Sequence, residues 1–135
     1  MQDIAINYWA LLVAAVLRIV VGALWYSPFA FAPAWRDLVG LDEARMKAGL
    51  PKAIVIDVVG SLVMAFVLVH AVVYAGAAGV GQGAAVGFFN WLGFVAVILL
   101  GVTTYEQRPL KLFFINAGFN LIALALMGTL LAVWR

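Results

Sequence analysis

The stretch Ala53–Tyr74 reads AIVIDVVGSLVMAFVLVHAVVY. It contains one side chain that is charged at neutral pH, Asp57, among apolar residues on both sides. A helix needs roughly 20 mainly apolar residues to cross the hydrocarbon core of a bilayer. The stretch is therefore predicted to be a transmembrane helix.

The rest of the chain has the same character. Of its 135 residues, 67% are hydrophobic and 10% are charged, whereas a soluble domain carries about 25% charged residues. So few charges cannot cover a water-facing surface, which predicts one integral membrane domain over residues 1–135. The expected fold is all-α, a bundle of four transmembrane helices. Their predicted ranges are about 4–26, 53–74, 84–104 and 110–134.

The distribution of lysine and arginine predicts the orientation. Loops one and three lie on the same side and carry six of them, Arg36, Arg45, Lys47, Lys52, Arg108 and Lys111. The opposite side carries only Arg135. Cytoplasmic loops are enriched in these residues, so both termini are expected outside the cytoplasm. The first apolar segment is expected to be retained, because the N-terminus lacks the positive charge of a signal peptide.

The first loop is predicted to be structured. Over about residues 33–49 we expect two short helices that lie at the membrane interface. Pro33 suits the first turn of one helix, and Asp42 can cap the start of the other, which Gly49 would end. Pro51 would then open the second transmembrane helix.

Aromatic residues mark the edge of the bilayer on this side. Their apolar rings and polar tips favour the interface between hydrocarbon and headgroups. The predicted interface belt consists of Trp25, Tyr26, Trp35 and Tyr105. A second interpretation, in which Trp25 lines a binding pocket, stays open.

Polar residues at membrane depth are the main functional candidates, because burying them in lipid is costly. Arg18 lies about 13 Å and Asp57 about 6 Å from the cytoplasmic ends of their helices, at 1.5 Å per residue. The predicted cluster consists of Arg18, Asp57, Ser61, Asn116 and Asn120, with an ion pair between the two charged residues. It could fasten helices together or form a substrate or ion site. Alternatively, Arg18 could face a protein partner or a lipid headgroup.

The outer half of the bundle holds a second candidate pair. His70 and Asn90 lie at similar depths, and a hydrogen bond between them is expected. A single histidine without a carboxylate nearby does not favour a metal site, and the chain has no cysteine. No catalytic or phosphate-binding motif is present, so neither enzymatic activity nor a cofactor is expected. A net charge of +2 does not suggest nucleic-acid binding.

Three glycines at four-residue spacing, Gly79, Gly83 and Gly87, open the third transmembrane segment. Small residues at this spacing let helix backbones approach closely in lipid. We therefore expect these glycines to form a helix-packing face, within the chain, in a homodimer or in a larger membrane complex.

Three features carry a family resemblance. They are the early Asn7, the string GALWYSP followed by AWRDLVGL, and RPLKLFFINAGFNLIALALMG before Trp134. With them the chain resembles the small bacterial four-helix membrane family catalogued as domain of unknown function 1761. The resemblance implies a four-helix fold in a bacterial inner membrane, and no established activity. Arg18 and Asn120 depart from the family pattern, in which an apolar or small residue and a histidine are usual.

These observations favour a structural, accessory or oligomeric membrane protein. The alternative is a homodimeric transporter of a small solute, an ion, a lipid or a quinone, working through Arg18, Asp57, Asn116 and Asn120. Proton-coupled exporters need a carboxylate near the membrane midplane, whereas Asp57 lies close to one end of its helix. The first interpretation is therefore preferred.

Overall fold

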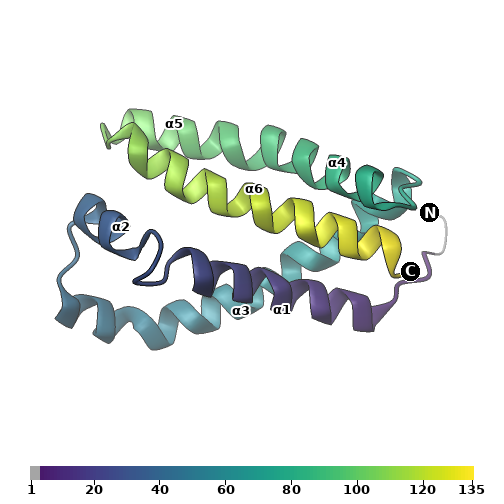
Figure 1. Ribbon diagram of the computed structural model, residues 1–135, viewed down its shortest axis with the longest axis horizontal. Coiled ribbons are helices and arrows are strands. Elements are labelled where there is room, and N and C mark those ends of the chain that lie inside the picture. The colour runs from purple at the N-terminus through teal and green to yellow at the C-terminus, as the bar shows by residue number, and fades with distance from the viewer. Residues whose placement is uncertain (1–3) are drawn as a thin grey trace.

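The protein is all-helical over residues 4–135, which are the residues that the computed structural model describes (Figure 1). Its elements are α1 (Tyr8–Trp25), α2 (Ala32–Val39), α3 (Glu43–Tyr74), α4 (Val80–Trp91), the π-helix η1 (Leu92–Ala96), α5 (Val97–Tyr105) and α6 (Leu110–Val133). Four helical segments are long and apolar enough to span a membrane: α1, α3, α4 to α5, and α6. The predicted class is confirmed, and the chain is a multi-pass membrane protein.

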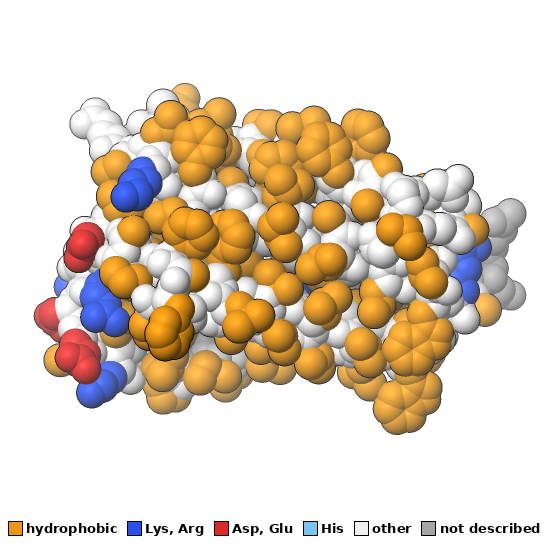
Figure 2. Space-filling model, viewed as in Figure 1, with side chains coloured by type: hydrophobic (Ala, Val, Ile, Leu, Met, Phe, Trp, Pro, Cys, Tyr) orange, Lys and Arg blue, Asp and Glu red, His pale blue; other side chains and the backbone are white. Residues whose placement is uncertain are grey.

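Helix α6 lies at the centre of the bundle. It packs against α4, α1 and α3, and in Figure 1 it runs between α4–α5 on one side and α1 with α3 on the other. The start of α1 and the end of α6 lie at one end, beside the α3–α4 connection, and we call this the terminal end. The charged end is the opposite one, with α2, the start of α3 and the α5–α6 turn. Figure 2 shows charged side chains gathered at the two ends and hydrophobic side chains between them.

The core is narrow and made largely of small residues. Ala14, Ala65 and Val72 are fully buried, together with the larger Met127 and Leu131 of α6. Many large apolar side chains are instead exposed on the outer faces of the helices. In a bilayer these faces contact lipid tails, so close approach of backbones, rather than exclusion of water, holds the helices together.

Helix α1 begins at Tyr8, four residues after the predicted start at Ile4. The side-chain oxygen of Asn7 accepts hydrogen bonds from the backbone nitrogens of Trp9 and Ala10, at 3.1 and 3.2 Å. This N-cap satisfies donors that have no partner within the helix. The cap therefore sets the start of the helix, although the apolar composition begins earlier.

The first loop contains one short helix instead of the predicted two. Helix α2 ends at Val39, and its C-cap Gly40 has the left-handed φ of 69°. The side chain of Asp42 caps the next helix, as expected, but that helix continues through Gly49 and Pro51 to the end of the second span. Pro51 removes one backbone hydrogen bond, and near the helix start the freed carbonyl can bind water or a headgroup instead. The predicted break is therefore wrong.

The third span also differs from its prediction. It begins at Val80 rather than at residue 84, and its helix contains the π-helical turn Leu92–Ala96. A π-turn inserts an extra residue and rotates the side chains that follow it. Helix α5 also packs on α6, and Ala96 and Thr103 are buried beyond Gly87 along this span.

Candidate functional site

Arg18 joins α1 to α3. Its Nη1 donates to Asp57 Oδ1 at 2.6 Å and to Ser61 Oγ at 2.8 Å. The Ser61 hydroxyl in turn donates to the backbone oxygen of Asp57 at 2.7 Å. The guanidinium carbon also lies 5.2 Å from the centre of the Phe119 ring on α6, within cation–π range. We call Arg18, Asp57, Ser61 and Phe119 the Arg18 clamp; it contains the predicted ion pair.

The two charged residues of the clamp are buried to different degrees. The Arg18 side chain is 12% exposed, whereas that of Asp57 is 49% exposed. Ser61 is fully buried. The buried Arg18 Nε has no hydrogen-bond partner among the described residues. The positive charge is thus enclosed between three helices, and the negative charge lies at their edge.

The predicted five-residue cluster does not form as one unit. Asn116 accepts a hydrogen bond from the Tyr26 hydroxyl at 2.7 Å, and Asn120 donates to the backbone oxygen of Asn116 at 2.9 Å. Among the described residues, no hydrogen bond joins either asparagine to the Arg18 clamp. Phe119 is the residue of α6 that packs on Arg18, whereas Asn116 binds Tyr26 at the end of α1 and Asn120 binds the backbone of its own helix.

Trp25 and Tyr26 also hold helices together. Trp25 Nε1 donates to the backbone oxygen of Ile115 at 2.9 Å. The Tyr26 ring packs edge-on against Trp35 of α2 and against Phe119, with centroid distances of 5.8 and 5.5 Å. The polar tips that were expected to reach headgroups instead bind α6. Tyr105, at the end of α5, is exposed, as a belt residue would be.

The expected bond between His70 and Asn90 is wrong. His70 Nδ1 binds the backbone oxygen of Phe66 at 2.6 Å, and Asn90 Nδ2 donates to the backbone oxygen of Val86 at 2.8 Å. Each side chain thus makes a hydrogen bond to the preceding turn of its own helix. Such a local bond satisfies a polar group in lipid without a second helix. His70 and Asn90 therefore do not bind each other, although they lie at similar depths in the membrane.

Gly83 and Gly87 pack directly against α6. A Cβ atom on Gly83 would lie 2.7 Å from the Cβ of Ala132, and a Cβ on Gly87 would meet the backbone oxygen of Leu124. Gly79 differs, because it precedes α4 as its N-cap and a Cβ there would meet no atom of the described residues within 4 Å.

Sequence reasoning missed two residues of this contact. Gly128 of α6 faces Gly83, so that the two backbones touch. Trp91 Nε1 donates to the backbone oxygen of Ala117 at 2.8 Å. A glycine inside the fourth span was a usable signal for the first of them, whereas the sequence has no signal for the partner of Trp91.

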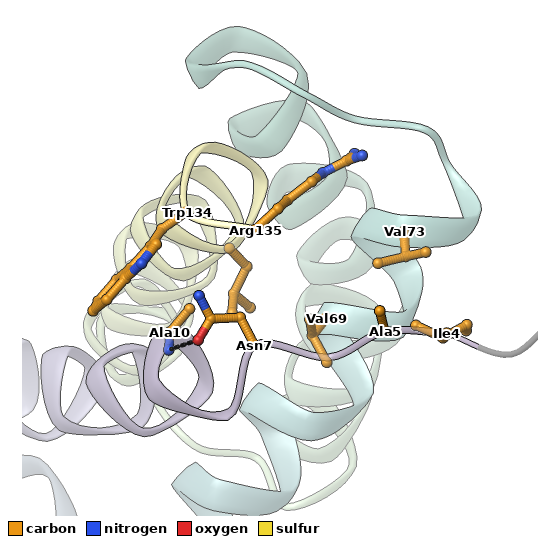
Figure 3. Close-up of a pocket in the computed structure, with 9 residues that line it drawn as sticks. Ile4, Ala5, Asn7, Ala10, Val69, Val73, Trp134 and Arg135 are labelled. Carbon is orange, nitrogen blue, oxygen red and sulfur yellow. Dashed lines mark hydrogen bonds between the residues drawn. The ribbon is translucent and has the colours of Figure 1, made fainter.

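Neither of two hollows in the bundle is lined by charged residues of the clamp. One lies at the terminal end, with a volume of about 350 Å³ (Figure 3). Its lining residues come from the chain before α1, from α1, α3 and the end of α6. The other lies between α3 and α4–η1. Within the described part of the chain, no group of three or more His, Cys, Asp or Glu residues could hold a metal ion.

The comparisons with known proteins point to one family. A family model described as "Protein of unknown function (DUF1761)" matches residues 9–132, which is most of the chain. Neither the curated proteins nor the solved structures contain a match.

Proposed function

This chain belongs to the DUF1761 family, and from that premise we propose that it is a non-catalytic accessory membrane protein. It acts by associating with another membrane-embedded protein, either a second copy of itself or a larger complex. The contact surface is the N-terminal half of α3. One observation carries this proposal: the half-exposed carboxylate of Asp57.

The segment of α3 before Ser61 is exposed along most of its length, and Asp57 is its residue that binds another helix, through the ion pair with Arg18. Every residue from Lys47 to Gly60 is exposed, and Ser61 is the first buried residue of α3. Apolar residues of this segment can face lipid without cost. Asp57 cannot face lipid without cost, because its side chain is charged and lies about 8 Å beyond Lys52 along the helix, toward the membrane interior. A charge that faces hydrocarbon costs several kcal/mol, about 2.5–3.5 kcal/mol on insertion scales. A polar group from a neighbouring protein would remove this cost.

The Arg18 clamp supports an accessory role over transport. Its nitrogens and oxygens join α1 to α3, and Arg18 also packs on α6. Neither hollow is lined by Arg18 or Asp57, so these hollows offer no space for a solute beside the ion pair. The transporter interpretation requires such a space in another state of the protein.

The absence of cysteine makes a direct test possible. In native membranes, Val55→Cys carrying a benzophenone maleimide is expected to give a photo-cross-link to protein, because its side chain lies on the free segment of α3. Ile98→Cys on α5 is the matched control, since it is equally exposed but lies outside that segment. Mass spectrometry of the adduct then distinguishes a second copy from a different protein. Lipid adducts alone at Val55, or equal protein adducts at both positions, would overturn the proposal.

We also propose that the charged end lies in the cytoplasm of a bacterium and the terminal end outside its inner membrane. The support is the six-to-one distribution of lysine and arginine. In intact cells, a membrane-impermeant maleimide is expected to label Ala78→Cys, between α3 and α4, and to leave Gln107→Cys, between α5 and α6, unlabelled. Both positions are exposed in the structure. The reverse labelling pattern would show that the orientation is inverted.

A further inference from the structure

The second hollow is a groove on the side of the bundle, with a volume of about 400 Å³. Volumes of about 300–1,000 Å³ are typical of small-molecule sites, which occur between the helices of bundles. We call it the midplane groove. Its described lining residues come from α3, α4, η1 and α6: Gly60, Val63, Met64, Val67, Leu68, Asn90, Phe94, Val95 and Leu124.

The lining restricts the chemistry of an occupant. None of these nine described residues is charged, and Asn90 is the only one with a polar side chain. A charged ligand would lose its hydration without gaining a counter-charge, so the occupant is uncharged. Gly60 leaves free space on the α3 side of the groove, because it has no side chain and a Cβ there would meet no atom of the described residues within 4 Å.

Asn90 retains hydrogen-bonding capacity. A carboxamide has two N–H donors and one acceptor oxygen. Of these, Nδ2 donates to the backbone oxygen of Val86, and no other hydrogen bond of this side chain occurs among the described residues. One N–H group is therefore available to a ligand oxygen. The neighbouring π-helix contributes Phe94 and Val95 to the same groove, and π-turns are frequent at functional sites.

The depth of Asn90 distinguishes between lipophilic ligands. Asn90 lies about 4 Å from the midpoint of the span Val80–Tyr105, at 1.5 Å per residue. The ester carbonyls of a phospholipid lie at the edge of a hydrocarbon core about 30 Å thick, or about 15 Å from its middle. They are thus too distant for Asn90. An uncharged molecule that carries its carbonyl into the hydrocarbon matches this depth.

We propose that the midplane groove binds a long-chain quinone or a similar uncharged, lipophilic carbonyl compound. Its carbonyl accepts a hydrogen bond from Asn90 Nδ2, and its apolar tail follows the wall formed by α3. This site is separate from the Arg18 clamp and does not depend on the accessory role proposed above.

The test uses the full chain in phospholipid nanodiscs and a benzoquinone with a ten-carbon tail as the probe. Saturable binding is expected for the unmodified protein. Asn90→Leu is expected to weaken binding about five- to tenfold, because one hydrogen bond is lost. Gly60→Leu is expected to abolish saturable binding, because its side chain fills the groove. Gly101→Leu is the matched control on α5 and is expected to bind normally; a Cβ at Gly101 meets no described atom within 4 Å.

Two variants keep the test decisive if one of them folds poorly. The proposal would be overturned if the Gly60→Leu and Asn90→Leu proteins both bound the quinone as tightly as the unmodified protein. Uptake that never saturates in any of the proteins would also overturn it. Native mass spectrometry identifies what remains bound to the protein. A phospholipid that stays bound in stoichiometric amount and is not displaced by the quinone would show that the groove is a lipid site, and would also overturn it.

Discussion

Gly87→Ala is expected to lower the free energy of unfolding by about 2 kcal/mol or more, because the new methyl group has no space. A Cβ at this position would meet the backbone oxygen of Leu124 and lie 2.9 Å from the Cα of Ala125. Backbone atoms cannot rotate away as a flexible side chain can. Helices α4 and α6 must therefore separate, which loses the contact between Gly83 and Gly128 as well. Unfolding in mixed micelles by SDS titration measures the effect.

The matched control for this prediction is Gly101→Ala. It makes the same substitution in the same span, where a Cβ would meet no atom of the described residues within 4 Å. Its free energy of unfolding is expected to stay within about 0.5 kcal/mol of the unmodified protein. If both variants lose the same stability, the cause is a general intolerance of α4 and α5 to alanine, and the close packing at Gly87 is not what holds the helices together.

Asp57→Leu is expected to destabilise the protein by about 3 kcal/mol, the lower end of the range for leaving a buried charge without its partner, because Arg18 is buried whereas Asp57 is half-exposed. It leaves the buried guanidinium of Arg18 without its counter-charge. The double variant Arg18→Leu/Asp57→Leu is expected to recover most of this loss, because neither charge then remains in the bilayer. A double-mutant cycle of the SDS unfolding free energies measures the coupling.

The reversed pair tests whether the clamp only fastens helices. Arg18→Asp/Asp57→Arg is expected to be more stable than either single reversal, because opposite charges again face each other across α1 and α3. Additive losses in the Leu cycle, or a reversed pair that stays unfolded although both single reversals fold, would argue against fastening. The latter result would instead favour a site that requires Arg18 on α1.

Which segments cross the membrane could be predicted from composition, because the requirement is local. Hydrocarbon offers no hydrogen bonds, so a long apolar segment must form a helix regardless of its neighbours. The ends of the helices were less predictable. Asn7 starts α1 later than its apolar composition suggests, and Pro51 lies inside α3 where a break was expected.

The candidate site was predictable in part for the same reason. Arg18 and Asp57 are both costly in lipid, carry opposite charges and lie in the same half of the membrane, which indicated a pair, and the structure contains it. Depth alone also suggested that His70 would bind Asn90, and that Asn116 and Asn120 would bind the ion pair. These contacts depend on which way each side chain points around its helix, and depth carries no information about that.

The amino-acid composition of each segment predicts a bundle of four membrane-spanning helices with most of its charges at the two ends, because the cost of exposing polar groups to lipid is a property of each segment. Which faces of the helices meet depends on packing in three dimensions. Gly83, Gly87 and Gly128 bring the backbones of α4 and α6 into contact and so set their rotation. Phe119, rather than Asn116 or Asn120, consequently faces Arg18, and Asn90 lines a groove instead of binding His70. Helix rotation depends on packing between distant segments, which no single stretch of sequence specifies.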